Sequence, residues 1–211
     1  MLTTTADRTR SEEGFTVLEV TMVSAILLLV MAAFFGMLLS LTKTEQRTNA
    51  LISNEQDARF VLTDLARDIR AANPMATFAT TSDYQSKVQV RLGTAPSQTI
   101  VRWVYDTAPA SATYRSLLRQ TIDPVSGAVL TSTERLRNVR NAERTPPVPM
   151  FGYTSQTGID LIAAGQASDV GNCAIQVHIT ITADSNPGPE PFTVVSDVQL
   201  RNRLPGGVGC G

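Results

Sequence analysis

The stretch Gly14-Phe15-Thr16-Val17-Leu18-Glu19 stands directly before a long apolar run and decides how this chain begins its fold. From Val20 to Leu41 no residue is charged. A helix of about 22 residues rises roughly 33 Å, which is enough to cross a bilayer core of about 30 Å. The run therefore predicts a membrane-spanning helix with a carboxylate, that of Glu19, at its entrance.

The acid at position 19 does not prevent insertion. Leu, Ile, Val and Phe residues in the run each favour insertion by roughly 0.3–0.6 kcal/mol, about 5 kcal/mol in total. Glu19 opposes insertion by up to roughly 3 kcal/mol at mid-membrane, and by less near the edge where it lies. An ionisable group in a membrane segment is a functional hypothesis by default, so Glu19 is a candidate functional residue.

The polar leader, residues 1–14, reverses the order of a secretory signal. In a secretory signal the apolar stretch precedes the cleavage site and is removed. Here the charged residues run directly up to Gly14. Cleavage after Gly14 would leave the apolar run on the mature protein.

The segment from Glu12 to Val20 resembles the class III signal of type IV prepilins and pseudopilins, whose pattern is a glycine, Phe, Thr, two apolar residues and Glu. The resemblance implies that prepilin peptidase cuts between Gly14 and Phe15 and methylates the new N-terminus of Phe15. Glu19 would become the fifth mature residue and the charge partner in assembly. Acids precede the glycine, where the family more often has a basic residue. The alternative is an ordinary signal anchor.

Looser elements farther along also resemble this family. They are Leu65–Ala72, Tyr114–Arg119, Phe151–Tyr153 and Val198–Asn202, in that order. Together they are similar to minor pilins of the PilW type and to pseudopilins of the J type. This resemblance implies a minor structural subunit in a filament-priming or tip complex. Its partners would be prepilin peptidase, other pilins through the N-terminal helix, the inner-membrane assembly machinery and the lipid bilayer.

The same resemblance implies a location. The precursor would cross the cytoplasmic (inner) membrane once with its N-terminus in the cytoplasm, and the mature chain would then enter an extracytoplasmic pilus or pseudopilus. Charge counting does not decide the orientation, because Arg8 and Arg10 before the run are balanced by Lys43 and Arg47 after it.

Helical spacing continues beyond the apolar run. One stripe is apolar: Leu51, Ala58, Leu62, Leu65, Ile69 and Ala72. The opposite face is expected to carry Glu55, Arg59, Asp64, Arg67, Asp68 and Arg70. Asn73-Pro74 predicts the end of the helix. One helix from Phe15 to about Ala72 is therefore expected, and its second half needs a sheet to cover the stripe.

The remaining sequence is typical of strands. The predicted strands are Lys87–Leu92, Thr99–Tyr105, Tyr114–Ile122, Ala128–Leu136, Ala174–Thr182 and Phe192–Leu200. The expected fold is α+β, with the long helix packed on an antiparallel sheet. The expected parts are the prepilin leader 1–14, the transmembrane half-helix 15–41, the amphipathic half-helix 42–73 and an extracytoplasmic pilin-like β domain 74–211.

Cys173 and Cys210 are the two cysteines. A bond between them would close the last strands and the Gly-rich tail and stabilise the chain by roughly 4 kcal/mol in the chain-entropy model. Many pilins resemble this, with a disulfide near the C-terminus. Two free thiols are the alternative.

No sequence pattern indicates catalysis, a metal or a cofactor. His178, the one histidine, is expected to be a surface residue on a polar strand face. A local basic cluster comprises Arg135, Arg137, Arg140 and Arg144. We interpret this cluster as a solvated face. The net charge of −1 gives no reason to expect nucleic-acid binding, so DNA stays an unsupported partner. The protein is thus expected not to be an enzyme. The competing hypothesis is a single-pass, membrane-anchored extracytoplasmic domain with a binding or enzymatic role.

Overall fold

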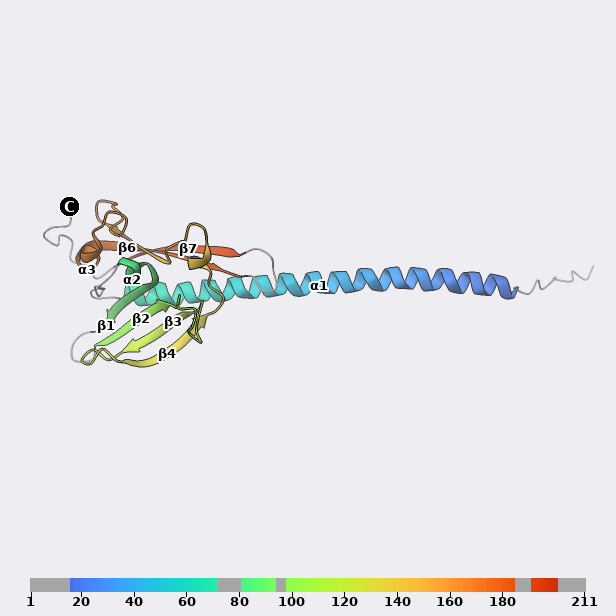
Figure 1. Ribbon diagram of the computed structural model, residues 1–211, viewed down its shortest axis with the longest axis horizontal. Helices are drawn as coiled ribbons and strands as arrows, with labels where there is room; N and C mark the ends of the chain where they lie inside the picture. The colour runs from blue at the N-terminus through green and yellow to red at the C-terminus, as the bar shows by residue number, and fades with distance from the viewer. Residues whose placement is uncertain (1–15, 72–80, 94–97, 185–190, 201–211) are drawn as a thin grey trace, which may run out of the picture. The chain divides into compact units, whose positions relative to one another are not determined.

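The computed structural model of the chain describes residues 16–71, 81–93, 98–184 and 191–200. These residues form one long helix packed against antiparallel sheets, which confirms the predicted α+β class. The chain divides into two compact units, Met1–Gln46 and Arg47–Gly211. Helix α1 (Val17–Arg70), drawn in blue to cyan in Figure 1, is continuous through both.

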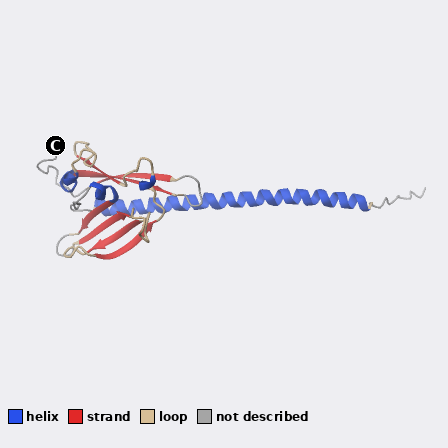
Figure 2. Cartoon of the chain, viewed as in Figure 1, coloured by secondary structure: helices blue, strands red, loops and turns tan. Residues whose placement is uncertain are grey.

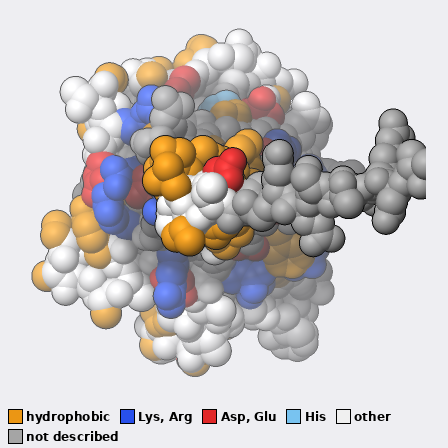
Figure 3. All heavy atoms as spheres, turned by 90° about the vertical axis from the view of Figure 1, so that its right-hand side faces the viewer, with side chains coloured by type: hydrophobic (Ala, Val, Ile, Leu, Met, Phe, Trp, Pro, Cys, Tyr) orange, Lys and Arg blue, Asp and Glu red, His pale blue; other side chains and the backbone are white. Residues whose placement is uncertain are grey.

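Helix α1 has 54 residues and follows the prediction closely. Phe15, Ala72 and the predicted stop at Pro74 lie outside the described residues. In the first unit every side chain from Thr16 to Gln46 is exposed. Figure 3 looks along the helix from its N-terminal end and shows hydrophobic side chains around that end, with acidic atoms among them. The described chain contains one helix long and apolar enough to cross a membrane.

The first sheet of the second unit has four strands in the order β1-β2-β3-β4. They are β1 (Lys87–Leu92), β2 (Thr99–Tyr105), β3 (Leu117–Ile122) and β4 (Val129–Leu136), all paired antiparallel. The first two match their predicted bounds. Strand β3 begins later than predicted because Arg115 has a φ of 65°, a left-handed conformation that interrupts extended backbone.

The second sheet has three strands in the order β5-β6-β7. They are β5 (Phe151–Ser155), β6 (Ala174–Ala183) and β7 (Phe192–Gln199). In β6 Val177, Ile179 and Ile181 are buried, and so are Thr180 and Thr182 on the other face, so the C-terminal half of this strand is covered on both sides. Strand β5 was not among the predicted strands. It is five residues long and buries Phe151 and Tyr153.

The C-terminal part of α1 supplies the core of the second unit. Figures 1 and 2 show the strands in two groups, one on each side of this part of the helix. The buried helix residues are Ala58, Val61, Leu62, Leu65, Ala66, Asp68 and Ile69. The predicted stripe is therefore correct in its C-terminal half, whereas Leu51 is 38% exposed. The placement of Asp68 on the solvent face was wrong, because its exposed fraction is 4%.

Short elements join the two sheets. Helix α2 (Thr81–Ser86) leads into β1, and its Tyr84 ring meets the Tyr153 ring of β5 edge to face at 5.8 Å. The Tyr153 hydroxyl donates to the Lys87 carbonyl at 3.0 Å. The remaining helical turns are η1 (Asn141–Glu143), η2 (Ala167–Asp169) and α3 (Val170–Cys173). The sheets thus share one core with α1, and Tyr153 of β5 joins them directly through its contacts with Tyr84 of α2 and Lys87 of β1.

Candidate functional site

The first turn of α1 is closed by a reciprocal pair of hydrogen bonds between Thr16 and Glu19. The Thr16 backbone N–H donates to Glu19 Oε2 at 3.0 Å, and the Glu19 backbone N–H donates to Thr16 Oγ1 at 3.3 Å. The Thr16 hydroxyl also donates to Glu19 Oε2 at 3.1 Å. This is a capping box, in which a Thr and a Glu three residues later satisfy N–H groups that the helix leaves open.

The box turns the Glu19 carboxylate back toward the start of the helix. There the aligned peptide dipoles place partial positive charge, which favours an anion. The sequence interpretation identified Glu19 as the candidate residue but missed Thr16, although Thr-x-x-Glu before an apolar run is a recognisable signal. Gly14 and Phe15, the predicted processing residues, lie outside the described residues.

Two hydroxyl groups in the apolar stretch, those of Thr21 and Ser24, are satisfied within the helix. The Thr21 hydroxyl donates to the Leu18 carbonyl at 2.8 Å, and the Ser24 hydroxyl donates to the Val20 carbonyl at 2.7 Å. Such internal bonds suit a helix in lipid, where water cannot satisfy polar groups. Glu19 is therefore the ionisable group that the first five turns of α1 present to their surroundings.

At its other end, α1 is fixed to the first sheet by two acids one turn apart. Asp68 Oδ2 accepts from the Trp103 indole N–H at 3.0 Å and from Arg119 Nε at 2.8 Å. Asp64 pairs with Arg135 of β4, and with Arg67 at 3.3 Å. A buried carboxylate is tolerated only with such partners. These acids hold the helix in one register on β2, β3 and β4.

The basic cluster is largely neutralised within the chain. Arg135 pairs with Asp64, Arg137 with Glu134 at 2.7 Å, and Arg140 with Asp184. The Arg137 guanidinium and the Ser116 hydroxyl together lower the pKa of Glu134 below its usual value. Charges committed to carboxylates are not available to neutralise phosphates, so the arrangement adds no support for DNA as a partner.

His178 lies on the exposed face of β6, as predicted, with 46% of its side chain accessible. Its Nδ1 is 2.6 Å from Asp197 Oδ1 on the paired strand β7. Gly152 of β5 is the residue opposite His178 on the other side. The described residues contain no group of three or more His, Cys, Asp or Glu side chains placed to hold a metal ion.

Cys173 ends α3 and is 6% exposed. Its predicted partner Cys210 lies outside the described residues, so the disulfide stays a prediction.

No protein-family model matches the chain, and no curated protein matches its sequence significantly.

Proposed function

We propose that this protein is a minor structural subunit of a type IV pilus or pseudopilus. In this proposal the precursor is anchored in the inner membrane by α1, with residues 1–14 in the cytoplasm. Prepilin peptidase cuts between Gly14 and Phe15 and methylates Phe15, and the mature chain joins a filament-priming or tip complex. It has a structural role rather than a catalytic one.

The observation that carries the proposal is the position of the Glu19 carboxylate. It stands at the beginning of a membrane-length apolar helix and is held by Thr16, the residue after the proposed new N-terminus. Cleavage would create an ammonium group on Phe15. In a low-dielectric environment a charge is stable only when paired, so the carboxylate and an ammonium are natural partners.

The capping box is compatible with removal of the leader. Its three hydrogen bonds involve Thr16 and Glu19 alone, and both residues follow the proposed cut. The helix start would therefore survive processing. The Glu19 carboxylate could then pair with the ammonium of its own chain or with that of an adjacent subunit, and the second arrangement would set the vertical register between two helices.

Mass spectrometry of the chain isolated from its native membrane tests the proposal. The expected mature species begins at Phe15, carries one added methyl group and lacks residues 1–14. The same cells without their prepilin peptidase should yield the full precursor. An intact leader in the peptidase-containing cells would contradict the proposal and favour the signal-anchor alternative.

A further inference from the structure

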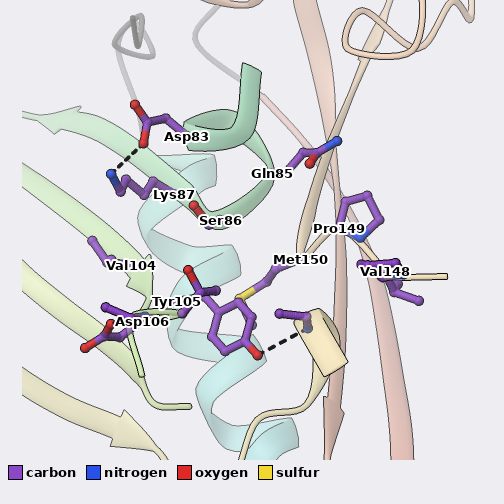
Figure 4. A pocket seen from close by; sticks show the side chains of 14 residues that line it. Asp83, Gln85, Ser86, Lys87, Val104, Tyr105, Asp106, Val148, Pro149 and Met150 are labelled. Atoms are coloured by element: carbon purple, nitrogen blue, oxygen red, sulfur yellow. Dashed lines mark hydrogen bonds and ion pairs between the residues drawn. The ribbon is translucent and has the colours of Figure 1, made fainter. Parts of the chain in front are cut away.

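On one side of the second unit the two sheets are bridged by hydrogen bonds of the chain itself. The Tyr153 hydroxyl of β5 donates to the Lys87 carbonyl of β1 at 3.0 Å. Farther along, the Tyr105 hydroxyl of β2 accepts from the Ala142 N–H of η1 at 3.2 Å, as Figure 4 shows. The cavity drawn there has a volume of about 550 Å³, and its Asp83–Lys87 ion pair is already formed, with Nζ 2.6 Å from Oδ1. The β5 side of the second sheet is therefore occupied by the chain itself.

The opposite edge of the second sheet, strand β7, is open. Its residues pair with β6 in continuous register, from Phe192 opposite Ala183 to Gln199 opposite Gln176. On its other side β7 forms no backbone hydrogen bond with the part of the chain that the structure describes. Alternate N–H and C=O groups along β7 therefore face outward without a partner from these residues, and such a row of groups is a template for another strand.

The other strand edges carry protection that β7 lacks. Strand β1 has two basic side chains, Lys87 and Arg91, and the register of β4 with β3 is interrupted twice. Strand β5 is covered by the segment that follows it, because the Leu161 N–H donates to the Tyr153 carbonyl at 2.9 Å. Charges, bulges and covering loops are the means by which natural sheets prevent strand addition. Strand β7 is regular and contains one charged residue, Asp197, so it is the edge best suited to accept a strand.

A groove of about 280 Å³ lies between β7 and the exposed side of α1. Its helix wall includes Leu62, Thr63 and Ala66, and its strand wall consists of Val195 and Ser196. These side chains are apolar or small, and Val195 is 54% exposed. A strand added to β7 would lie about 4.8 Å from it and direct every second side chain toward this groove. The open edge and the groove are separate features that fit the same extended occupant.

The charges of the groove distinguish between possible partners. Arg59 and Arg70 are the charged residues among its described lining, which includes no carboxylate. Arg59 is paired with Glu55 at 2.7 Å, whereas Arg70 is exposed and forms no ion pair within the described part of the chain. A second copy joined through β7 by a twofold axis would bring two grooves lined by arginine together, which like charges disfavour. A different strand with a carboxylate on its inward face would instead supply a partner for Arg70.

We propose that β7 accepts an extended segment of a different protein as an added strand. This strand pairs with the outward backbone groups of β7, directs small or apolar side chains toward Leu62 and Ala66, and places a carboxylate against Arg70. Main-chain hydrogen bonds supply the affinity, and the alternate side chains supply the specificity. The surface lies wholly in the second unit and depends neither on processing nor on the role of Glu19, so this proposal and the pilin function can fail separately.

Amide NMR of the full chain in lipid nanodiscs, with a synthetic strand as the probe, tests the pairing. The probe is the acetylated, amidated peptide Thr-Val-Thr-Asp-Thr-Val, whose second, fourth and sixth side chains share one face. We expect saturable shifts and slower hydrogen exchange at alternate amides of β7, with a dissociation constant below about 10 mM. The same peptide N-methylated at its third and fourth residues lacks one donor on each edge and should bind at least about threefold more weakly. No saturable change in β7, or equal binding of the two peptides, would overturn the proposal.

Two variants of the helix locate the probe. Thr63→Trp places a large side chain in the groove from an exposed position, whereas Gln56→Trp adds the same ring at an exposed position of α1 that does not line the groove. We expect Thr63→Trp to weaken binding by at least about fivefold and Gln56→Trp to stay within about twofold of the wild-type chain. Unchanged binding in Thr63→Trp would place the peptide elsewhere and refute the site.

Charge reversal tests the role of Arg70. The peptide with Lys in place of Asp should bind the wild-type chain about threefold more weakly at low salt, and Arg70→Glu should reverse that order. Arg91→Glu, at an exposed arginine of β1 that forms no ion pair with the described residues, should leave the order unchanged. An unreversed order in Arg70→Glu would reject the proposed carboxylate contact. Protection of β7 amides that grows with protein concentration in the absence of any probe would identify a second copy as the occupant and overturn the assignment to a different protein.

Discussion

The indole N–H of Trp103 donates to Asp68 Oδ2 at 3.0 Å, so the largest buried side chain of the first sheet is bonded to a buried acid of the helix. The same oxygen accepts from Arg119 Nε at 2.8 Å. The carboxylate therefore connects α1 to β2 and β3 at one point.

Replacement of Asp68 by Ala should destabilise the second unit. The change leaves the Trp103 N–H without its acceptor and Arg119 without its counter-ion, although water reaches Arg119 because its side chain is 31% exposed. We expect a loss of about 2–3 kcal/mol in the free energy of unfolding, measured by denaturant titration of Trp103 fluorescence. Asp57→Ala, at an exposed position of the same helix, should change it by less than about 0.5 kcal/mol. Equal effects of the two changes would contradict this role of Asp68.

Asn141 should contribute as much to the stability of the fold as a buried apolar residue does. Its Nδ2 donates to the Thr180 carbonyl at 2.7 Å, and its Oδ1 accepts from the Thr182 N–H at 2.8 Å. The side chain thus takes the place of a neighbouring strand beside β6. Asn141→Leu keeps the volume but leaves two buried backbone groups unpaired, which should reduce stability by about 2–4 kcal/mol in thermal or denaturant unfolding. Thr133→Val on exposed β4 is the control, and a comparable loss there would refute the explanation.

Glu19 has two roles that substitutions can separate: it closes the capping box, and it carries a negative charge. Glutamine also closes a capping box, so Glu19→Gln preserves the helix start and removes only the charge, whereas Glu19→Ala removes both. If the charge pairs with a Phe15 ammonium, both variants should be processed normally and both should be missing from sheared filaments on immunoblots. Normal incorporation of Glu19→Gln would show that the charge is dispensable.

Processing should depend on the residue before the proposed cut. Gly14→Leu should leave the precursor uncut, seen as a chain longer by residues 1–14 on gels and in mass spectra. Gly36→Leu makes the same change within the apolar run, where an added Cβ would meet nothing within 4 Å beyond its chain neighbours and the helix's own backbone, and should be cut normally. A mature-size band from Gly14→Leu would reject the proposed cleavage site.

The predicted bond between Cys173 and Cys210 has a direct test. Freshly isolated protein should resist alkylation until it is reduced, and intact mass should rise on reduction by the mass of two hydrogens. Cys210→Ser should then lower the free energy of unfolding by up to about 4 kcal/mol in the chain-entropy model. Two thiols that alkylate without reductant would exclude the disulfide.

Local periodicity predicted most of the elements, and tertiary partners account for what it missed. The alternating residues of β1 and β6 and the apolar run of β2 were sufficient to predict where these three strands lie in the sequence. Asp68 was misplaced because an acid on a helix looks solvent-facing until a Trp and an Arg from distant strands are seen to meet it. Strand β5 is short and contains Gly152, so it has too few alternating residues to be recognised.

The candidate site also has a part that the sequence could predict and a part that it could not. Glu19 was identifiable from its chemistry, since a carboxylate beside an apolar run is costly without a purpose. Thr16 was visible in the sequence as the first residue of a capping box and was missed. The cavity lined by Tyr105, Ala142 and Met150 could not be predicted, because these residues converge on it from β2, from η1 and from the position just before β5.

The two acids on the last turns of α1 have a mechanical consequence. Asp64 and Asp68 lie one helical turn apart and form ion pairs with arginines of neighbouring strands. The buried Leu65 and Ile69 pack beside them. A tensile force along the helix axis would load these attachments together, in shear, rather than one after another as in the opening of a zipper. Structures loaded in shear yield only when many contacts fail at once, so the helix should resist extraction from its sheets even where each separate attachment is weak.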